Sequence, residues 1–199
     1  MVDIGAGSTD VTVFQHGFLY HSFSLPVAGD HFTNDIAVGL RTPIPEAERI
    51  KRGFGIATVE LAGELISIEV PRVGDRPSRQ VPQKELAQIL QPRAQELLEL
   101  IHQELCRLGV DRQMGAGIIF TGGAARLAGL CDLAEQTLGM TARIGLAPQL
   151  EGAPDVLREP AYTALIGLLY YSQRLRQMRQ DREPSLAQRL KTILMGGSH

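Results

Sequence analysis

Short apolar runs alternate with longer segments of helical period along most of this chain. Alternating or continuous apolar residues predict strands, and apolar residues three and four positions apart predict amphipathic helices. The expected strands are a meander of two or three within 1–25, followed by 65–70, 117–121 and 141–145. The expected helices cover 30–40, 43–53, 83–90, 92–108, 127–138 and 161–171. This alternation of strands and helices is typical of an α/β fold.

Several of these boundaries depend on individual residues. Asp30 is a candidate N-cap, because its side chain can accept a hydrogen bond from the first helical turn. Pro43 and Pro45 are expected to start the next helix. Pro92 is expected to open a separate helix, since proline is tolerated in the first turn of a helix but not in its interior. Residues 71–82 are expected to form a loop.

A glycine-rich turn joins the first two expected strands. Its sequence is Asp3-Ile4-Gly5-Ala6-Gly7-Ser8-Thr9-Asp10. Gly5 and Gly7 can adopt positive φ, successive backbone N–H groups in such a turn form an anion-binding concavity, and the Ser8 and Thr9 hydroxyls add donors. The carboxylate of Asp3 would repel a bare phosphate, so Mg²⁺ is expected there, bound through few carboxylates and several waters. An ordinary glycine-rich β-hairpin is an equally good interpretation of this turn alone.

Two further segments have the chemistry of a nucleoside site. Gly122, Gly123 and Ala124 follow the expected strand 117–121, and glycines there would let a flat ring or a sugar approach the backbone. Glu48 and Lys51 lie three residues apart in an expected helix, so they share one face. This acid–base pair could bond ribose hydroxyls, although a surface ion pair is the simpler interpretation of the pair in isolation.

Composition excludes several classes of protein. The chain has 199 residues, of which 44% are hydrophobic and 21% charged, which is enough for one or two domains with a core. The net charge of −2 gives no indication of a nucleic-acid partner. Cys106 and Cys131 are too few for a disulfide framework or a zinc site. No apolar run approaches the length of a membrane span, so a globular cytoplasmic protein is expected.

The chain changes character after Tyr171. Residues 172–184 are rich in Gln and Arg without an apolar period, and are expected to form an exposed helix end and a linker. One face of a following helix would carry Leu186, Leu190, Ile193 and Leu194, with Arg189 and Lys191 off that face. Residues 172–192 contain six basic and two acidic residues, a net charge of +4. A basic amphipathic helix favours an anionic membrane surface, and docking of a terminal helix on its own domain is the alternative.

The phosphate loop, the acid–base pair and the Gly-Gly loop occur in an order that resembles the second half of the actin-like ATPase superfamily. A finer resemblance, over roughly residues 1–171, is to the FtsA family of bacterial cell-division proteins. The segments that carry it are 3–14, 29–43, 47–55, 70–77, 91–93 and 121–125. Ala6 stands where that family's loop usually has a third glycine, and Ser8 stands where threonine is usual. Both residues are small, so the resemblance still implies a phosphate loop.

The resemblance implies an actin-like, ribonuclease-H-like half: a mixed sheet with helices and an inserted α/β subdomain. Residues 1–43 and 113–171 would form subdomain IIA, 44–112 subdomain IIB, 172–184 a linker and 185–199 a membrane-targeting tail. The family's first half would precede residue 1, so the chain is interpreted as a C-terminal half. Because ATP lies between two halves in this superfamily, the chain would supply one wall of the cleft.

The resemblance also implies a function, namely an ATP-binding adaptor that polymerises with itself and tethers FtsZ filaments to the inner face of the cytoplasmic membrane. ATP and Mg²⁺ would serve mainly to close the cleft, and any hydrolysis would need a water-orienting residue from the first half. The residues expected at the nucleotide are Asp3 (to Mg²⁺ through water), Gly5, Ala6, Gly7, Ser8, Thr9, Glu48, Lys51, Gly122, Gly123, Ala124 and, stacking on the base, Arg126. Arg93 and Glu96, near an expected helix start, would bind the C-terminal tail of FtsZ. The alternatives are a pilus-assembly adaptor of the same superfamily, or a sugar or acetate kinase.

Overall fold

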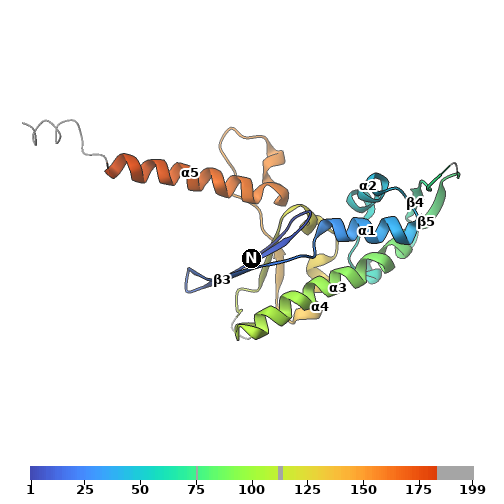
Figure 1. Ribbon diagram of the computed structural model, residues 1–199, viewed down its shortest axis with the longest axis horizontal. Helices are drawn as coiled ribbons and strands as arrows, with labels where there is room; N and C mark the ends of the chain where they lie inside the picture. The colour runs from blue at the N-terminus through green and yellow to red at the C-terminus, as the bar shows by residue number, and fades with distance from the viewer. Residues whose placement is uncertain (75, 112–113, 183–199) are drawn as a thin grey trace, which may run out of the picture. The chain divides into compact units, whose positions relative to one another are not determined.

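The structure is a computed structural model that describes residues 1–74, 76–111 and 114–182 (Figure 1). The chain divides into two compact units, Met1–Thr163 and Ala164–His199. The described part of the second unit contains most of one helix, α5 (Thr163–Arg182). All other helices and strands described below belong to the first unit.

A five-stranded mixed sheet forms the centre of the first unit. Its spatial order is β3-β2-β1-β6-β7. The strands are β1 (Val2–Ile4), β2 (Thr9–Gln15), β3 (Phe18–Leu25), β6 (Ile118–Thr121) and β7 (Ala142–Ile144). The first three are antiparallel neighbours, whereas β6 runs parallel to both β1 and β7. His16 and Gly17, with φ of 52° and 82°, make the tight turn between β2 and β3. The predicted meander and the strands at 117–121 and 141–145 are therefore confirmed.

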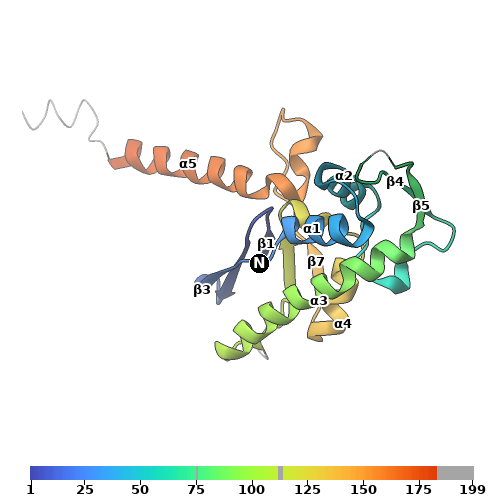
Figure 2. The ribbon, with the colours of Figure 1, turned by 45° about the vertical axis from the view of Figure 1, so that its right-hand side comes forward.

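Helices pack beside this sheet and complete one continuous core. They are α1 (Gly29–Leu40), α2 (Ile44–Phe54), α3 (Gln83–Arg107) and α4 (Leu130–Leu138), with short 3₁₀ helices η1 (Val59–Leu61), η3 (Gly123–Arg126), η4 (Asp155–Arg158) and η5 (Pro160–Tyr162). Helix α3 packs against both α1 and α4, and α4 also contacts β7 (Figure 2). Phe32 and Ile36 of α1, Leu97 and Ile101 of α3, and Phe120 of β6 are all buried in this core.

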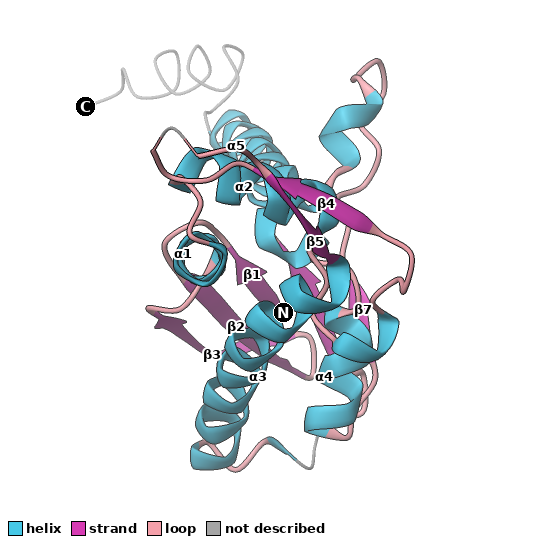
Figure 3. Cartoon of the chain, turned by 90° about the vertical axis from the view of Figure 1, so that its right-hand side faces the viewer, coloured by secondary structure: helices cyan, strands magenta, loops and turns pink. Residues whose placement is uncertain are grey.

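A small hairpin, β4 (Ser67–Val70) and β5 (Arg79–Pro82), lies beyond α2 (Figure 3). The expectation of a loop throughout 71–82 is wrong at its end, where β5 pairs with β4 in antiparallel register. Val81 lies opposite Ile68, and both side chains are completely buried. The strand is only four residues long, which is too short for an alternating pattern to stand out in the sequence.

Helix α3 is continuous through Pro92, so the prediction of two helices meeting there is wrong. An interior proline removes one backbone hydrogen bond and costs about 3 kcal/mol. Leu86, Leu90, Leu97 and Ile101, on both sides of the proline, are completely buried along one helix face. Burying such side chains gains roughly 1.5–3 kcal/mol each, which outweighs the local cost. Arg93 accordingly lies inside the helix rather than near its start.

Other helix ends partly match the sequence prediction. Helix α2 begins after Pro43 and ends at Gly55, as predicted. Helix α1 has Ala28 at its N-cap, so Asp30 is a first-turn residue and not the cap. Helix α5 continues to Arg182, so residues 172–182 are helical where a helix end and linker were expected. The proposed tail, 185–199, lies outside the described residues. No helix within the described ranges is long and apolar enough to span a bilayer.

Candidate functional site

The turn between β1 and β2 is stabilised by a hydrogen bond within the turn and by a second one from helix α1. The Gly5 N–H donates to the Ser8 carbonyl at 3.0 Å, and the Gly29 N–H donates to the Gly5 carbonyl at 3.0 Å. The N–H groups of Ala6, Gly7 and Ser8 have no acceptor among the described residues, and all three residues are exposed. These three N–H groups can therefore receive an anion on the open side of the turn.

Three details of this turn differ from the sequence prediction. Neither Gly5 nor Gly7 is among the described residues with positive φ. Gly5 is needed for space instead, since a Cβ there would lie 3.1 Å from the Ser8 carbonyl oxygen. The prediction of a free hydroxyl at Thr9 is wrong, because that buried hydroxyl donates to the Val27 carbonyl at 2.7 Å. Strand β2 is tied to the start of α1 in this way, and the Thr9 side chain does not face a ligand.

Asp3 lies at the point where three segments meet. It pairs with Asp10 across the β1–β2 ladder and with Thr121 across the β1–β6 ladder. Partial burial, and then the charge of Asp10, raise the pKa of the Asp3 carboxyl. A cation beside Asp3 would relieve this repulsion. Among the described residues no three His, Cys, Asp or Glu side chains gather as metal ligands, and Mg²⁺, which keeps several of its waters, suits a single carboxylate.

Gly122 packs directly onto Asp3. Its φ is 88°, and an added Cβ would lie 2.3 Å from Asp3 Oδ1 and 2.4 Å from the Ile4 carbonyl oxygen. No side chain fits there, so Gly122 keeps β6 close to β1 at the carboxyl ends of these parallel strands. Ligands of open α/β sheets bind at that edge. Gly123 and Ala124 continue from Gly122 into the 3₁₀ helix η3.

Glu48 and Lys51 of α2 form a connected polar cluster with Thr33 of α1. Lys51 Nζ lies 2.6 Å from Glu48 Oε2, and it also donates to Thr33 Oγ1 at 2.8 Å and to the Gly29 carbonyl at 2.9 Å. The Thr33 hydroxyl donates to Glu48 Oε2 at 2.6 Å. Arg52 donates to the other carboxylate oxygen at 2.7 Å. The pair predicted from the sequence is therefore anchored to α1 and is not a free surface ion pair.

The cluster strongly favours the charged form of Glu48. Partial burial by itself raises the pKa of the carboxyl, but hydrogen bonds from Lys51, Thr33 and Arg52 outweigh it and lower the pKa from 4.5 to about 2. The carboxylate is therefore ionised at neutral pH and can accept hydrogen bonds from sugar hydroxyls. The three N–H donors of Lys51 already contact Glu48, Thr33 and the Gly29 carbonyl, so Lys51 can donate to a ligand by exchanging one of these contacts.

Gly29 lies close to the phosphate-loop candidate, the acid–base pair and the Gly-Gly loop. A Cβ added to it would lie 2.9 Å from the Gly5 carbonyl oxygen, 3.4 Å from Ala124 Cβ and 3.6 Å from Ala6 Cα. Its own carbonyl accepts the Lys51 ammonium. The phosphate-loop candidate, the acid–base pair and the Gly-Gly loop thus surround the first turn of α1. We call this surface the nucleotide wall, after the ligand expected from the sequence; its members are Asp3, Gly5–Ser8, Gly29, Thr33, Glu48, Lys51 and Gly122–Ala124.

Arg126 and Arg93 are each engaged with acidic side chains. Arg126, in η3, forms an exposed ion pair with Glu159 at 2.6 Å. Arg93 makes a bidentate contact with Asp35 of α1, with Nε to Oδ2 at 2.7 Å and Nη2 to Oδ1 at 3.0 Å. It also bonds Glu96 one turn along α3. These hydrogen bonds, above all those to Asp35, raise the pKa of the Arg93 guanidinium.

Comparison with known proteins agrees with this arrangement. The family model of cell division protein FtsA matches residues 1–167. The chain belongs to the FtsA family. It is 43% identical over 171 residues to FtsA of Pseudomonas aeruginosa, and 39% identical over 180 residues to FtsA of Escherichia coli. These alignments cover 86% and 87% of this chain but only 41% and 43% of the two relatives. The chain therefore spans about two fifths of the length of the FtsA relatives that it matches.

The fold is actin-like. The structure of MreB5 of Spiroplasma citri bound to AMPPNP superposes with a TM-score of 0.69 at 19% identity, covering 90% of this chain and 54% of that protein. At this identity the likeness concerns the fold alone. The mixed sheet with helices predicted for an actin-like half is confirmed.

Two residues of the nucleotide wall were missed as site residues by sequence reasoning. Thr33 belongs to no sequence motif, because its partners Glu48 and Lys51 lie 15 and 18 positions away along the chain. Gly29 does carry a signal, as a glycine directly before an expected FtsA-type helix, but its close neighbours become visible only in three dimensions. The tail residues 186–194 lie outside the described ranges, so their assignment stays a prediction.

Proposed function

We propose that this chain forms one wall of the ATP site of an FtsA-type adaptor, which tethers FtsZ filaments to the inner face of the cytoplasmic membrane. The observation that carries the nucleotide part is the convergence on Gly29. Residues drawn from 3–9, 48–51 and 122–124 are brought to one edge of the sheet. Their chemistries are complementary to the phosphates, the ribose and the base of one nucleotide.

Each part of the wall has a role in this proposal. The free N–H groups of Ala6, Gly7 and Ser8 hold phosphate oxygens. Asp3 holds Mg²⁺ through water, and the ion neutralises phosphate charge. Glu48 accepts from the ribose hydroxyls, and Lys51 donates to them by exchanging one of its three protein contacts. The backbone of 122–124 lies against the adenosine, where the absence of a side chain at Gly123 permits close approach.

Arg126 completes the wall if it exchanges Glu159 for the face of the base, since a guanidinium plane can stack on an aromatic ring. Its ion pair is exposed, and such pairs contribute only about 0–1 kcal/mol, so the exchange costs little. That MreB5 of the same fold was solved with AMPPNP supports a nucleotide here. The other wall would come from the remainder of an FtsA protein, and ATP would act mainly by closing the two walls.

Nucleotide binding is tested by titrating Mg²⁺–ATP into the isotope-labelled chain and following backbone amide resonances. We expect weak binding with shifts at residues 6–8 and 122–124, because half of the contacts are supplied elsewhere. Glu48→Gln should reduce the shifts, whereas Glu104→Gln, which removes an equally exposed carboxylate from a different ion pair, should not. Submicromolar affinity of the chain alone would refute the single-wall interpretation, and shifts elsewhere would refute the site.

The partner part of the proposal concerns Arg93 and Glu96 on α3. Arg93 can exchange one of its two acidic contacts for a carboxylate of the FtsZ C-terminal tail, bound in the same bidentate manner. Glu96, about half exposed, can accept a basic residue of that peptide. Both side chains are already ordered by their present ion pairs, which lowers the entropy cost of recognition.

Peptide binding by Arg93→Glu, compared with the unaltered chain, tests this assignment. Because Arg93→Glu would also place a like charge beside Asp35, Arg93→Gln and a circular dichroism spectrum of each variant separate lost recognition from lost folding. Arg107→Glu, an exposed substitution later in α3, is the control. Equal affinity of all folded variants for the FtsZ tail would remove Arg93 from the site.

Membrane tethering is proposed for residues 185–199. Eleven residues from Ser185 would span only about 16 Å as a helix, well short of the ~30 Å hydrocarbon layer, so the segment would lie in the interface plane. Leu186, Leu190, Ile193 and Leu194 would enter the acyl boundary, and Arg189 and Lys191 would face anionic headgroups. One copy binds weakly in this scheme, and a polymer binds strongly because many tails act together.

A further inference from the structure

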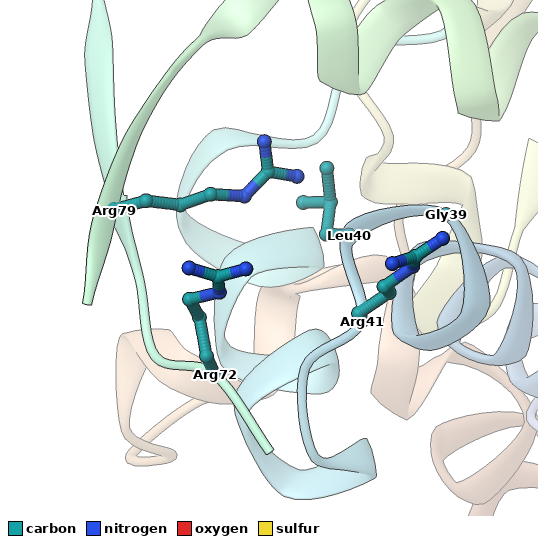
Figure 4. A pocket seen from close by; sticks show the side chains of 5 residues that line it. All are labelled: Gly39, Leu40, Arg41, Arg72 and Arg79. Atoms are coloured by element: carbon teal, nitrogen blue, oxygen red, sulfur yellow. The ribbon is translucent and has the colours of Figure 1, made fainter. Parts of the chain in front are cut away.

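Three arginines surround a cavity at the far end of α1. The cavity has a volume of about 280 Å³ and is lined by Gly39, Leu40, Arg41, Arg72 and Arg79. Arg41 follows the last turn of α1, Arg72 follows β4, and Arg79 opens β5. Figure 4 shows Arg72 and Arg79 extending from the hairpin side toward Leu40, and Arg41 on the α1 side with its guanidinium turned toward Gly39. We call this feature the arginine cavity.

These guanidinium groups are poorly neutralised by the protein. Among the described residues, neither Arg41 nor Arg72 has a carboxylate within ion-pair distance or a side-chain hydrogen bond. Arg79 reaches only Glu85, at 3.3 Å and with both side chains well exposed. Elsewhere on the described surface, arginines such as Arg49, Arg52, Arg93 and Arg107 have acidic partners within 3 Å. Cations that line one cavity without acidic partners repel one another unless an anion joins them.

A structural role in ending α1 does not explain these arginines. Cationic side chains often stabilise the free carbonyl groups at the C-terminus of a helix. Here backbone groups take that role: the Thr42 N–H donates to the Ala37 carbonyl, the Arg41 N–H donates to the Val38 carbonyl, and the Val73 N–H donates to the Arg41 carbonyl. Arg41 also has a φ of 53°, a left-handed conformation in which glycine or asparagine is the usual residue.

We propose that the arginine cavity is a binding site for a dianionic phosphate group, either inorganic phosphate or a small phosphate monoester. Among the described residues, three guanidinium groups and the carboxylate of Glu85 leave a formal charge of +2, which a phosphate dianion neutralises and a single carboxylate does not. Arginine presents its donors in a planar fork that matches phosphate oxygens. The volume of 280 Å³ is several times the ~30 Å³ of one water molecule, so the anion fits with part of its hydration.

The arginine cavity is separate from the nucleotide wall. Gly29, at the wall, and Gly39, at the cavity, lie ten residues apart on α1, or about 15 Å along the helix axis. The two sites share no residue. The two proposals rest on different residues, so each can fail without the other.

The test uses the 199-residue chain labelled with ¹⁵N and titrated with sodium phosphate at constant ionic strength. Side-chain Nε–H resonances of Arg41, Arg72 and Arg79 report the cavity, and the amides of residues 6–8 report the nucleotide wall. We expect saturable shifts of the three arginine resonances. Arg72→Gln should weaken binding about tenfold, since it removes charge-assisted hydrogen bonds, and Arg41→Gln should act likewise.

A gain-of-function variant makes the test independent of folding defects. Glu85→Gln removes the competing carboxylate, so it should strengthen phosphate binding about two- to fivefold. The control Arg107→Gln removes an arginine at the C-terminal end of α3, outside the cavity, and should change nothing. Glycerol phosphate in place of inorganic phosphate distinguishes a monoester site, and acetate tests for a response to any anion.

The proposal is overturned if phosphate shifts no arginine resonance, or if acetate shifts the same resonances with equal affinity. It is equally overturned if Glu85→Gln leaves the affinity for phosphate unchanged, or if Arg41→Gln and Arg72→Gln remain folded and bind phosphate as tightly as the unaltered chain. Binding of an acidic peptide that phosphate cannot displace would assign the cavity to a protein partner instead. Shifts confined to residues 6–8 would leave phosphate at the nucleotide wall and refute the cavity.

Discussion

The carboxylate of Glu48 offers a direct test of how α1 and α2 are held together. Glu48→Gln keeps the size of the side chain and removes its charge. Lys51, whose side chain is only 12% exposed, then keeps its contacts to Gly29 and Thr33 but loses its counter-ion. The variant should therefore be less stable at neutral pH than the unaltered chain.

The magnitude follows from the pKa. One pKa unit corresponds to about 1.4 kcal/mol, so a fall from 4.5 to about 2 gives about 3.5 kcal/mol as an upper bound. Glu48 is 32% exposed, and solvent screening reduces this to about 1–2 kcal/mol. Because the folded-state pKa is lowered, the stabilisation is fully present above pH 4.5 and is lost as the pH falls towards about 2.

Urea unfolding at pH 7, 4.5 and about 2.5 measures this linkage. The difference in unfolding free energy between the unaltered chain and Glu48→Gln should be largest at pH 7 and shrink towards the lowest pH. Glu104→Gln is the control, because its carboxylate is also 32% exposed but pairs with Arg107, which is 64% exposed. A difference that is the same at all three pH values, or no larger than that of the control, would show that the cluster is not coupled as described.

Three other substitutions or truncations give distinct outcomes. Gly122→Ala should lower the unfolding free energy by more than about 2 kcal/mol, because Gly122 has a positive φ and an added Cβ would collide with Asp3. The control is Gly152→Ala, at a φ of 75° with open space around it, which should lower the unfolding free energy by only about 1 kcal/mol. Equal losses of unfolding free energy in the two glycine variants would contradict the close approach of Gly122 to Asp3. Thr33→Val should cost about 1–3 kcal/mol in urea unfolding, because it leaves the buried part of the polar cluster without its hydroxyl; a neutral result would mean that the hydroxyl is replaceable by water. Co-sedimentation with anionic and neutral liposomes should deplete the intact chain more than a chain ending at Pro184 on anionic lipid only, and equal sedimentation would exclude the tail as the anchor.

The elements that the sequence predicts well are those with a local signal. Alternating apolar residues define the β2–β3 hairpin, and the His16-Gly17 pair gives its turn. Pro43 marks the start of α2 because a fixed φ suits a helix start. Apart from Gly29 and Thr33, the residues of the nucleotide wall were proposed for their chemistry and order, and the structure brings them to one edge of the sheet.

The elements that the sequence does not predict depend on distant contacts. Strand β5 forms because Val81 is buried opposite Ile68, and nothing within 79–82 alone indicates it. Pro92 is tolerated because buried residues on both sides hold α3 together. The Thr9 hydroxyl turns to Val27, 18 positions away. In each case a tertiary contact of about 1–3 kcal/mol overrides a weaker local preference.

Helix α1 is a single rigid element that joins the nucleotide wall to the arginine cavity. Its first residue, Gly29, abuts Gly5 at the nucleotide wall, Phe32 and Ile36 are clamped in the core near its middle, and Arg41 follows its other end. Twelve uninterrupted residues make a stiff rod of about 18 Å. If a ligand tilted one end of this rod, the rod's stiffness would carry the tilt to the opposite end. The two ends belong to one element, and thermodynamic linkage requires that any influence of one on the other is reciprocal.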